Sequence, residues 1–397
     1  MNDTTLFRRL PLPNTALAFD LDALYKCLQA IPDHRGRQGR QYALADILLL
    51  GVLAKLAGAD GCRAIAHWAS LRTQELSQVL QWKRARMPHY STWSRVLASA
   101  VHPQEVEQLV GDFFATTTTR TPRKRASLHV ALDGKTLRGT IPLGQTAGVH
   151  LLAVYEPEQG GVLTQMNVQG KGHELTCAPT VLRHLDLRGV VVSGDAMVAQ
   201  RNLSLQIVQA KGDYLWTVKD NQEGLREEIE VLFEPHRPHV GTSAVPTDFH
   251  TVRTIEKGLG RLEKRTLTVS SLLASYSTWP HLAQVFKLEC QRTDGLGRTE
   301  VKIRYGVTSL PASLVTAKRL LELIREHWQI ENGLHYRRDV TFREDHGQVR
   351  MGHAPEMVAL LNNVVLGLLG RQGETNIAHA RRDFAYQFEK SLLALAP

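Results

Sequence analysis

Cysteine is scarce in this chain, and long apolar runs are absent. The 397 residues include four cysteines, Cys27, Cys62, Cys177 and Cys290, which lie far apart. They form no CxxC pair and show no Cys/His spacing typical of a zinc site. The sequence therefore excludes a disulfide scaffold and indicates reduced thiols in an intracellular protein.

No stretch has the length of a membrane-spanning helix. Residues 1–12 carry Arg8 and Arg9 but lack the apolar run of a signal peptide. The most apolar stretch, residues 47–57, contains Lys55, whereas a membrane helix needs about 20 residues. We therefore expect a soluble cytoplasmic protein with no membrane partner.

The composition is that of a globular protein with excess positive charge. Apolar residues make up 43% and charged residues 22%, with no internal repeat or low-complexity tract. The length predicts two or three domains. The 48 Lys and Arg outnumber the 39 Asp and Glu, which gives a net charge of +9. This excess is compatible with a polyanionic partner, but many basic proteins have none.

The first 120 residues have the pattern of several short helices. Residues 42–56 are rich in Leu and Ala and are followed by glycines, while residues 91–97 begin with hydroxyl side chains that can cap a helix. Short helices with basic turns suit a DNA-binding domain of the helix-turn-helix kind. A helical packing or dimerisation domain is the alternative.

A polar, basic segment with a proline, residues 116–125, reads as an exposed linker. It ends in Arg123, Lys124 and Arg125. These cations either follow a DNA backbone or belong to a solvated hinge.

Beyond the linker the sequence alternates between strands and helices. Residues 235–304 then show the two-residue alternation of β-strands, and the earlier pattern resumes at 305 with a long helix over 316–338. This order predicts an α/β domain that contains a β-rich insertion. The other predicted strands are 128–132, 149–155, 162–168, 189–193 and 214–218, and the predicted helices are 175–185, 200–209 and 223–233.

Two acidic residues end predicted strands, and a third lies on the long helix. Asp133 follows the first strand, Asp195 follows the fourth, and Glu331 lies on the helix. Strand ends of an open sheet form the rim where ligands bind. Three carboxylates there would hold two Mg²⁺ ions roughly 3.5–4 Å apart, an arrangement that serves phosphodiester chemistry. Taken singly, each acid is an ordinary turn or surface residue.

Basic and amide side chains accompany these acids. Lys135 and Arg138 follow the first acid, and Lys219, Asn221 and Gln222 follow the strand after the second. We expect them to line the same rim and contact DNA phosphates, with structural roles as the alternative.

The long helix places further polar residues at helical spacing. His327, Glu331 and His335 are four residues apart, and Arg338 follows on the same face. One interpretation is a transition-metal site. The favoured one has Glu331 binding Mg²⁺ while the histidines and Arg338 contact the DNA backbone or pack locally.

Several of these segments together resemble a known family. Residues 133–139 (DGKTLRG) resemble the first acidic motif of the ISAs1-type insertion-sequence transposases, DDE enzymes similar to the wider IS4 group. Residues 194–197 resemble the second motif, 212–222 the segment with Lys, Asn and Gln, and 325–335 the third motif. The likeness covers nearly the whole chain.

The resemblance implies an α/β RNase H-like catalytic domain with a β-rich insertion, preceded by an all-α DNA-binding domain. Asp133, Asp195 and Glu331 would be its metal-binding triad, with two Mg²⁺ ions and Mn²⁺ as a substitute. The implied boundaries are 1–122 for the helical domain and linker, 123–234 and 305–372 for the catalytic domain, 235–304 for the insertion and 373–397 for a C-terminal tail.

One part of the wider pattern is not matched. The IS4 signature has Tyr, Arg and Lys where this chain has Ile324, His327 and Arg338. The roles of the signature residues therefore do not transfer directly, although none of the three acids is replaced.

The implied function is DNA transposition. The enzyme would bind the terminal inverted repeats of its element, cleave them and join them to target DNA. Its partners would be double-stranded DNA and a second subunit in a synaptic homodimer, in the cytoplasm of a bacterium and at its nucleoid. The alternatives are a catalytically silent DNA-binding protein derived from a transposase and an RNase H-like nuclease that cuts without joining.

Overall fold

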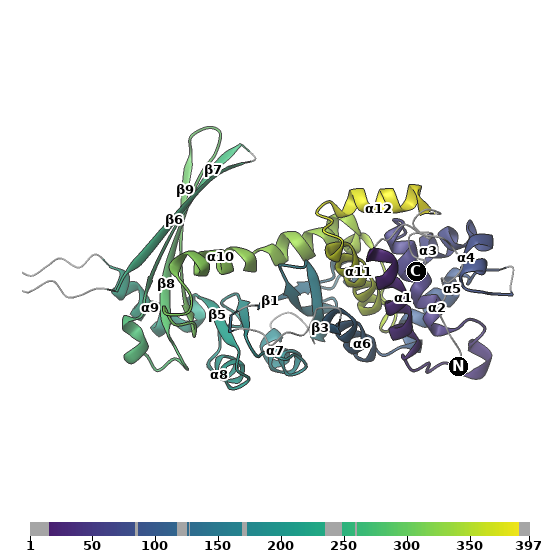
Figure 1. Cartoon of the computed structure of the whole chain (residues 1–397), viewed down its shortest axis with the longest axis horizontal. Coiled ribbons are helices and arrows are strands. Elements are labelled where there is room, and N and C mark those ends of the chain that lie inside the picture. Colours follow the sequence, from purple (N-terminus) through teal and green to yellow (C-terminus); the bar gives the residue numbers. More distant parts are fainter. Residues whose placement is uncertain are drawn as a thin grey trace, which may run out of the picture. The chain divides into compact units, whose positions relative to one another are not determined.

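The computed structural model describes residues 16–83, 86–116, 125–126, 128–168, 173–234, 248–258 and 260–388 (Figure 1). The chain forms two compact units whose segments alternate along the sequence. The first unit holds the described parts of residues 1–120, 134–173 and 330–397, and the second those of 121–133 and 174–329. The domain boundaries implied by the sequence stay predictions.

Helices dominate the first unit. All residues of α2 are buried, because its run of Leu, Ile, Val and Ala is apolar on every side. The helix packs against α1 and α11. The helices of this unit are α1 (Ala16–Gln29), α2 (Leu44–Leu56), α3 (Cys62–Ser70), α4 (Thr73–Val79), α5 (Tyr90–Arg95), α6 (Pro103–Thr116), α11 (Ala354–Arg371) and α12 (Ile377–Tyr386).

The first unit also holds an antiparallel hairpin, β2 (His150–Glu156) and β3 (Gly161–Val168). Every residue of β2 is buried. Helices α6 and α11 pack against β3. The hairpin is thus a central element of this unit.

The second unit is built on a sheet with the strand order β1-β4-β5-β9-β8-β7-β6. The first three of these strands are parallel, and the later neighbours are antiparallel. The strands are β1 (Leu128–Thr136), β4 (Val190–Gly194), β5 (Asp213–Val218), β6 (His250–Gly258), β7 (Arg261–Ser270), β8 (Gln284–Thr293) and β9 (Thr299–Thr308). The helices are α7 (Glu174–Arg183), α8 (Arg201–Gln209), α9 (Glu223–Phe233) and α10 (Ala317–His327).

The core of the second unit lies between this sheet and α10. Leu320, Leu321 and Ile324 of the helix pack with Leu267 and Phe286 of the sheet. At 3.6 residues per turn, the leucine and isoleucine positions of α10 share one face, which explains why this side of the helix is buried.

The mixed α/β class expected from the sequence is confirmed. All regular elements within the described part of residues 16–116 are helical. One prediction was wrong: the helix expected over 316–338 ends at His327 and is followed by two π-helical turns, η6 (Glu331–His335) and η7 (Arg337–Thr341). Strand β9 also begins at Thr299, so the predicted insertion boundary at 304 falls inside a strand.

Helices α1, α6, α11 and α12 were not predicted. Their apolar positions are interrupted by polar residues that the structure buries, such as Asn362 and Asn363 of α11. None of the helices in the described ranges is both long and apolar enough to cross a membrane.

Candidate active site

Two aspartates lie at the same edge of the parallel part of the sheet. Leu132 of β1 pairs in register with Gly194 of β4. Asp133 and Asp195 are the next residues after this pair, and both are partly buried. The paired segments of these parallel strands end at this pair, so the two carboxylates lie at the same level of the sheet. Asp133 was predicted to follow the first strand, but it lies inside β1, which continues to Thr136.

A glycine directly before Asp195 is required by packing. A Cβ atom on Gly194 would come within 2.1 Å of Val198 Cγ2 and 2.9 Å of the Trp216 ring. Any larger residue would push the turn after β4 away from β5. The glycine therefore lets the chain fold back immediately beyond the strand and keeps Asp195 at the sheet edge.

The environment of Asp195 disfavours its charged form. Burial raises its pKa, and the nearby charge of Asp133 raises it further. The backbone N–H of Met197 donates to Asp195 Oδ1 at 2.9 Å, and the positive charge of Lys219 also acts to lower the pKa. Two carboxylates that repel each other in this way form an oxygen-donor pair that a bound cation would stabilise.

The segment after β5 braces the turn that carries Asp195. Asn221 Nδ2 donates to the carbonyl of Ala196 at 2.6 Å, and Gln222 Nε2 donates to the carbonyl of Ala199 at 3.1 Å. The amides expected to contact DNA thus hydrogen-bond to the protein's own backbone. Lys219 is exposed and remains available to a phosphate.

A buried chain of hydrogen bonds connects α10 to β1 and β4. His129 Nδ1 lies 2.9 Å from Glu326 Oε2, and His129 Nε2 lies 2.8 Å from Ser193 Oγ. Ser193 Oγ lies 2.9 Å from His327 Nδ1. Because a carboxylate only accepts, His129 donates from Nδ1 and accepts the Ser193 hydroxyl, whose oxygen accepts from His327. Ser193 is two residues from Asp195, so this chain anchors the strand that carries it.

Burial lowers the pKa of His327 to about 4, so its ring is neutral near pH 7. Glu326 has a pKa of about 2, because it is hydrogen-bonded to His129 and to Arg319. His327, expected to contact the DNA backbone, instead lies in the interior with Ser193 as its partner.

Glu331 is exposed at the start of the π-helical turn η6 in the first unit. The π-helical hydrogen bonding replaces the four-residue spacing on which a shared face with His335 was predicted. His335 is buried. A Cβ on Gly333 would lie 2.2 Å from the Tyr155 hydroxyl oxygen, so glycine is needed where this turn meets β2. Such π-turns are frequent at functional sites.

Arg338 is an interior residue with no exposed surface. Its Nε donates to Glu344 Oε2 at 2.8 Å, and Asn362 Nδ2 donates to Glu344 Oε1 at 2.9 Å. Asn362 Oδ1 in turn accepts from Lys55 Nζ at 2.7 Å. The DNA contact predicted for Arg338 is therefore not available in this structure, because its charge is used inside the first unit.

Other predicted basic contacts are also ion-paired. Lys135 is buried, with Nζ 2.6 Å from Asp339 Oδ2. Arg125 makes two hydrogen bonds to Asp213, at 2.8 and 2.7 Å. Arg138 is exposed, with its Nε 3.8 Å from an oxygen of Asp345. Arg123 and Lys124 lie outside the described residues.

The described side chains show whether a divalent cation fits at the two aspartates. Within the described ranges, no three His, Cys, Asp or Glu side chains gather in an arrangement that could hold a metal ion. The repelling pair of Asp133 and Asp195 does supply hard oxygen donors, which suit Mg²⁺ or Mn²⁺. The aspartate pair therefore fits a divalent cation.

Family models match most of the sequence. The model described as "Transposase DDE domain" matches residues 124–366, and the model described as "DDE_Tnp_1-associated" matches residues 25–114. The chain belongs to the transposase DDE domain family. It is therefore an enzyme of the DNA transposase class, which acts with divalent metal ions.

Similar proteins carry transposase names. The chain is 29% identical over 356 residues to the putative transposase YncI of Escherichia coli O157:H7, which covers 88% of this chain and 87% of the relative. It is 27% identical over 361 residues to the H repeat-associated putative transposase YhhI of E. coli K12, covering 88% and 91%. Among solved structures, a piggyBac transposase synaptic complex with hairpin DNA aligns at a TM-score of 0.42 and 11% identity, over 95% of this chain and 80% of that one.

Sequence reasoning missed the transposase's interior hydrogen-bond chain. His129 lies among apolar residues in the first half of β1, Ser193 is the polar residue of β4, and Glu326 precedes a histidine on α10. A polar residue inside a buried strand is a signal that a partner faces it. The identity of the partners depends on how α10 packs across the sheet.

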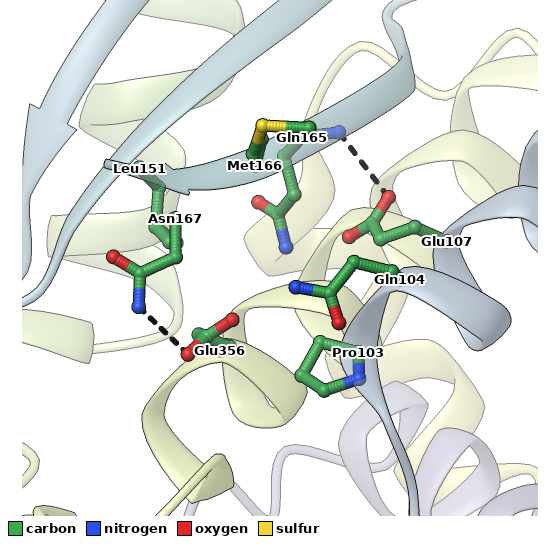
Figure 2. A pocket seen from close by; sticks show the side chains of 8 residues that line it. All are labelled: Pro103, Gln104, Glu107, Leu151, Gln165, Met166, Asn167 and Glu356. Atoms are coloured by element: carbon green, nitrogen blue, oxygen red, sulfur yellow. Dashed lines mark hydrogen bonds between the residues drawn. The ribbon is translucent and has the colours of Figure 1, made fainter. Parts of the chain in front are cut away.

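The transposase also has a small polar pocket in its first unit, shown in Figure 2. Glu107 of α6 accepts from the backbone N–H of Gln165 at 3.3 Å, and Asn167 Nδ2 donates to Glu356 Oε1 at 2.7 Å. Burial raises the pKa of Glu107 to about 8, so this carboxyl is largely protonated below neutral pH.

Proposed function

We propose that this enzyme is an insertion-sequence transposase of the ISAs1 type that binds terminal inverted repeats and catalyses DNA strand cleavage and strand transfer. The observation that carries the proposal is that Asp133 and Asp195 directly follow the last register pair of two adjacent parallel strands. Paired carboxylates in this setting are suited to binding cations beside a phosphodiester.

The metal ligands are Asp133, Asp195 and Glu331. The mutual repulsion of the two aspartates supports cation binding at this pair. Glu331 is proposed as the third ligand because its carboxylate is exposed and it lies in the segment that resembles the family's third motif. The proposed ions are two Mg²⁺, with Mn²⁺ as a substitute. Bound divalent cations would help to activate the attacking hydroxyl and stabilise the leaving oxygen.

Groups of the protein itself hold Asp195 in position next to the reacting strand. The Met197 N–H fixes one oxygen of Asp195, and the bonds from Asn221 and Gln222 hold the turn beneath it. The exposed ammonium of Lys219 neutralises a phosphate next to the cleaved bond. These groups are positioned before DNA arrives, which lowers the cost of ordering the site.

The reaction has two displacements at phosphorus. Water attacks the phosphate at the element end, the bond from phosphorus to the 3′ oxygen breaks, and a 3′-hydroxyl and a 5′-phosphate result. That 3′-hydroxyl then attacks a target phosphodiester, forming one phosphorus–oxygen bond and breaking another. No covalent protein intermediate and no energy cofactor are needed.

The assembly proposed around this chemistry follows the family resemblance. The catalytic domain is RNase H-like, a proposal supported by the parallel order β1-β4-β5. The helices of residues 16–116 bind end DNA, and Arg138 meets the backbone beside the site. The active form is a homodimer that joins two element ends in the cytoplasm of a bacterium.

A reconstituted reaction tests this function. The purified protein is incubated with Mg²⁺, a plasmid that carries its gene with both flanking sequences, and a second plasmid as target. Wild-type protein should give joined products, and Asp195→Asn should give none. DNA binding without cleavage by wild-type protein would contradict the proposal in favour of a silent DNA-binding protein, and cleavage without joining would favour a nuclease.

A further inference from the structure

Positive charge is concentrated in the strands β6 to β9. Residues 250–304 contain ten Lys and Arg against five Asp and Glu, so this segment holds +5 of the chain's net charge of +9. Figure 1 shows the far ends of β6, β7 and β9 reaching out beyond α9 and α10. We call this four-stranded extension, residues 250–258, 261–270, 284–293 and 299–308, the ribbon.

The strand register divides the ribbon into two faces. Leu267 and Leu288 are register partners, and they pack in the core against α10. The residues on this side form the inner face. Because side chains alternate along a strand, the row that joins Ile255, Lys264 and Val301 lies on the opposite, outer face.

The acidic side chains of the inner face are all ion-paired. Glu256 pairs with Arg265 at 3.1 Å, and Glu263 pairs with Arg261 at 2.8 Å. Further ion pairs are Arg325–Glu256 at 2.6 Å, Arg292–Glu263 at 3.7 Å and Lys302–Glu300 at 2.9 Å, and Arg298–Asp294 at 2.7 Å in the turn between β8 and β9. The positive charge of the inner face is therefore largely balanced.

The outer face has unbalanced cations. Arg253, Lys257 and Lys264 lie there, and none of them forms an ion pair with any residue in the described ranges. Glu289 is the outer-face carboxylate in the same register row as Arg253, and it accepts a hydrogen bond from Gln291 at 2.7 Å.

Exposed aliphatic side chains lie among these cations. Ile255 is 63% exposed, and Leu262, Val301 and Ile303 are also exposed on the outer face. Apolar groups gathered on an exposed sheet surface, and rimmed by polar ones, mark an interaction site. The cations decide which class of partner fits.

Helix α9 bounds this surface at its inner end. The helix packs on β8 and β9, and the charges of Glu230 and Glu234 act on Tyr305 of the outer face. Its acidic residues would repel a polyanion. The free cationic surface is therefore the far part of the outer face, around Arg253, Lys257 and Lys264.

We propose that the outer face of the ribbon binds the phosphate backbone of double-stranded DNA, an inference that rests on the proposed function and adds a second DNA contact to it. The three unpaired cations neutralise phosphates, and the aliphatic side chains lie against the sugar edge of the duplex.

The dimensions of the surface suit this partner. From Arg253 to Lys257 the strand extends about 14 Å, at roughly 3.4 Å per residue. Duplex DNA carries one negative charge per roughly 1.7 Å of axis, so a surface of this length faces several phosphates. A protein partner would need carboxylates matched to three fixed positions, whereas DNA presents phosphates along its whole length.

The salt dependence of DNA binding tests the proposal. The outer-face variant is Arg253→Gln/Lys257→Gln/Lys264→Gln. The control is Arg292→Gln/Arg298→Gln/Lys302→Gln, which removes the same charge from ion-paired positions on β8, on β9 and in the turn between them. Binding to a random-sequence duplex is measured by fluorescence anisotropy without divalent metal between 50 and 300 mM salt.

Each lost phosphate contact lowers the slope of log K against log salt by roughly 0.9. The outer-face variant should therefore have a slope shallower by about 2 to 3 and bind on the order of 10²-fold more weakly at 0.1 M salt. The control should change the slope by less than about 1. Lys257→Arg/Lys264→Arg, which keeps the charges, should retain the wild-type slope.

Three results would overturn the proposal. An unchanged slope would mean that the cations only keep an exposed edge strand soluble. Equal losses in the outer-face variant and the control would mean that net charge alone matters. Loss of a dimer by sedimentation with an unchanged slope would mean that the face binds a second copy. Failure of strand transfer in wild-type protein leaves this binding test intact, so the two proposals fail separately.

Discussion

Asp133 and Asp195 directly follow the two members of one register pair, Leu132 and Gly194, the last pair between the parallel strands β1 and β4. Their relationship is fixed by main-chain hydrogen bonding of β1 and β4, so it does not depend on the rotamer of either side chain. The tight turn that Gly194 permits keeps Asp195 at this edge. A cation held here would be positioned by two strands that main-chain hydrogen bonds join.

Asp195→Asn should abolish catalysis without unfolding the protein. Removing one charged oxygen donor should lower the strand-transfer rate at least about 10³-fold, equivalent to about 4 kcal/mol. The melting temperature should not fall, because the change removes a partly buried charge that is repelled by Asp133. Asp186→Asn, at an exposed aspartate of the same unit, should leave the rate unchanged. A drop in melting temperature with Asp195→Asn would contradict this account of the site.

Divalent metal should stabilise the protein through the aspartate pair. A ligand that binds only the folded state adds about 2.7 kcal/mol at 100 times its dissociation constant. Adding Mn²⁺ should therefore raise the melting temperature, and EDTA should reverse the effect. Asp133→Asn/Asp195→Asn should show no rise. An equal rise in this double variant would show that the metal binds elsewhere.

Acid should destabilise the second unit through His327. Its pKa of about 4 in the folded state lies below the unfolded value of about 6.5, so folding favours the neutral ring. Stability should fall as pH decreases from about 6.5 towards 4, by up to roughly 1.4 kcal/mol per pH unit. Urea denaturation at several pH values measures this, and His327→Gln should flatten the dependence over this window.

Arg338→Met should destabilise the first unit strongly. It leaves Glu344 as a buried charge without its cation, a change that costs roughly 3–5 kcal/mol. Arg338→Met/Glu344→Gln removes both charges and should recover much of the loss. Thermal and urea unfolding of both variants test this. A mild effect of Arg338→Met combined with weaker DNA binding would instead support the phosphate contact predicted from the sequence.

Glu107→Gln should remove a pH dependence of stability whose sign is opposite to that of His327. The folded pKa of about 8 lies above the unfolded value of about 4.3, so the wild-type protein should lose stability as pH rises from about 4.3 to about 8. The amide keeps the shape and still accepts from the Gln165 N–H. The difference between the unfolding free energies at pH 5 and pH 8 should be several kcal/mol smaller in the variant than in the wild-type protein. An unchanged pH dependence would show that Glu107 is ionised in the folded protein.

Local patterns predicted many of the elements well. Residues 189–193 and 214–218 are short apolar runs, and the structure has strands at Val190–Gly194 and Asp213–Val218. The prediction of an acid at a strand end is confirmed for Asp195, which directly follows β4, but was wrong for Asp133, because β1 continues to Thr136. The same reasoning failed over 316–338, since the residue pattern of a helix does not show where π-turns replace it.

Basic residues show the limit of sequence reasoning most clearly. Lys135 was predicted to contact DNA because it follows the first acid, and Arg338 to contact DNA or pack locally because it shares a helix face with Glu331. Both are buried with carboxylate partners. Their partners, Asp339 and Glu344, come from turns whose positions are set by tertiary packing. Conversely, the strand register decides which cations of the ribbon are unpaired, and this register cannot be read from the sequence.

The sequence by itself determined the acidic residue that follows β4 and the family motifs, because these depend on residues that are close together in the chain. Only the tertiary structure decided which charges remain free. Lys55 lies within an apolar run, and its buried ammonium is bound by Asn362, 307 residues further along. Such a pairing is set by the packing of α2 against α11, and the cost of burying an unpaired charge makes that packing specific.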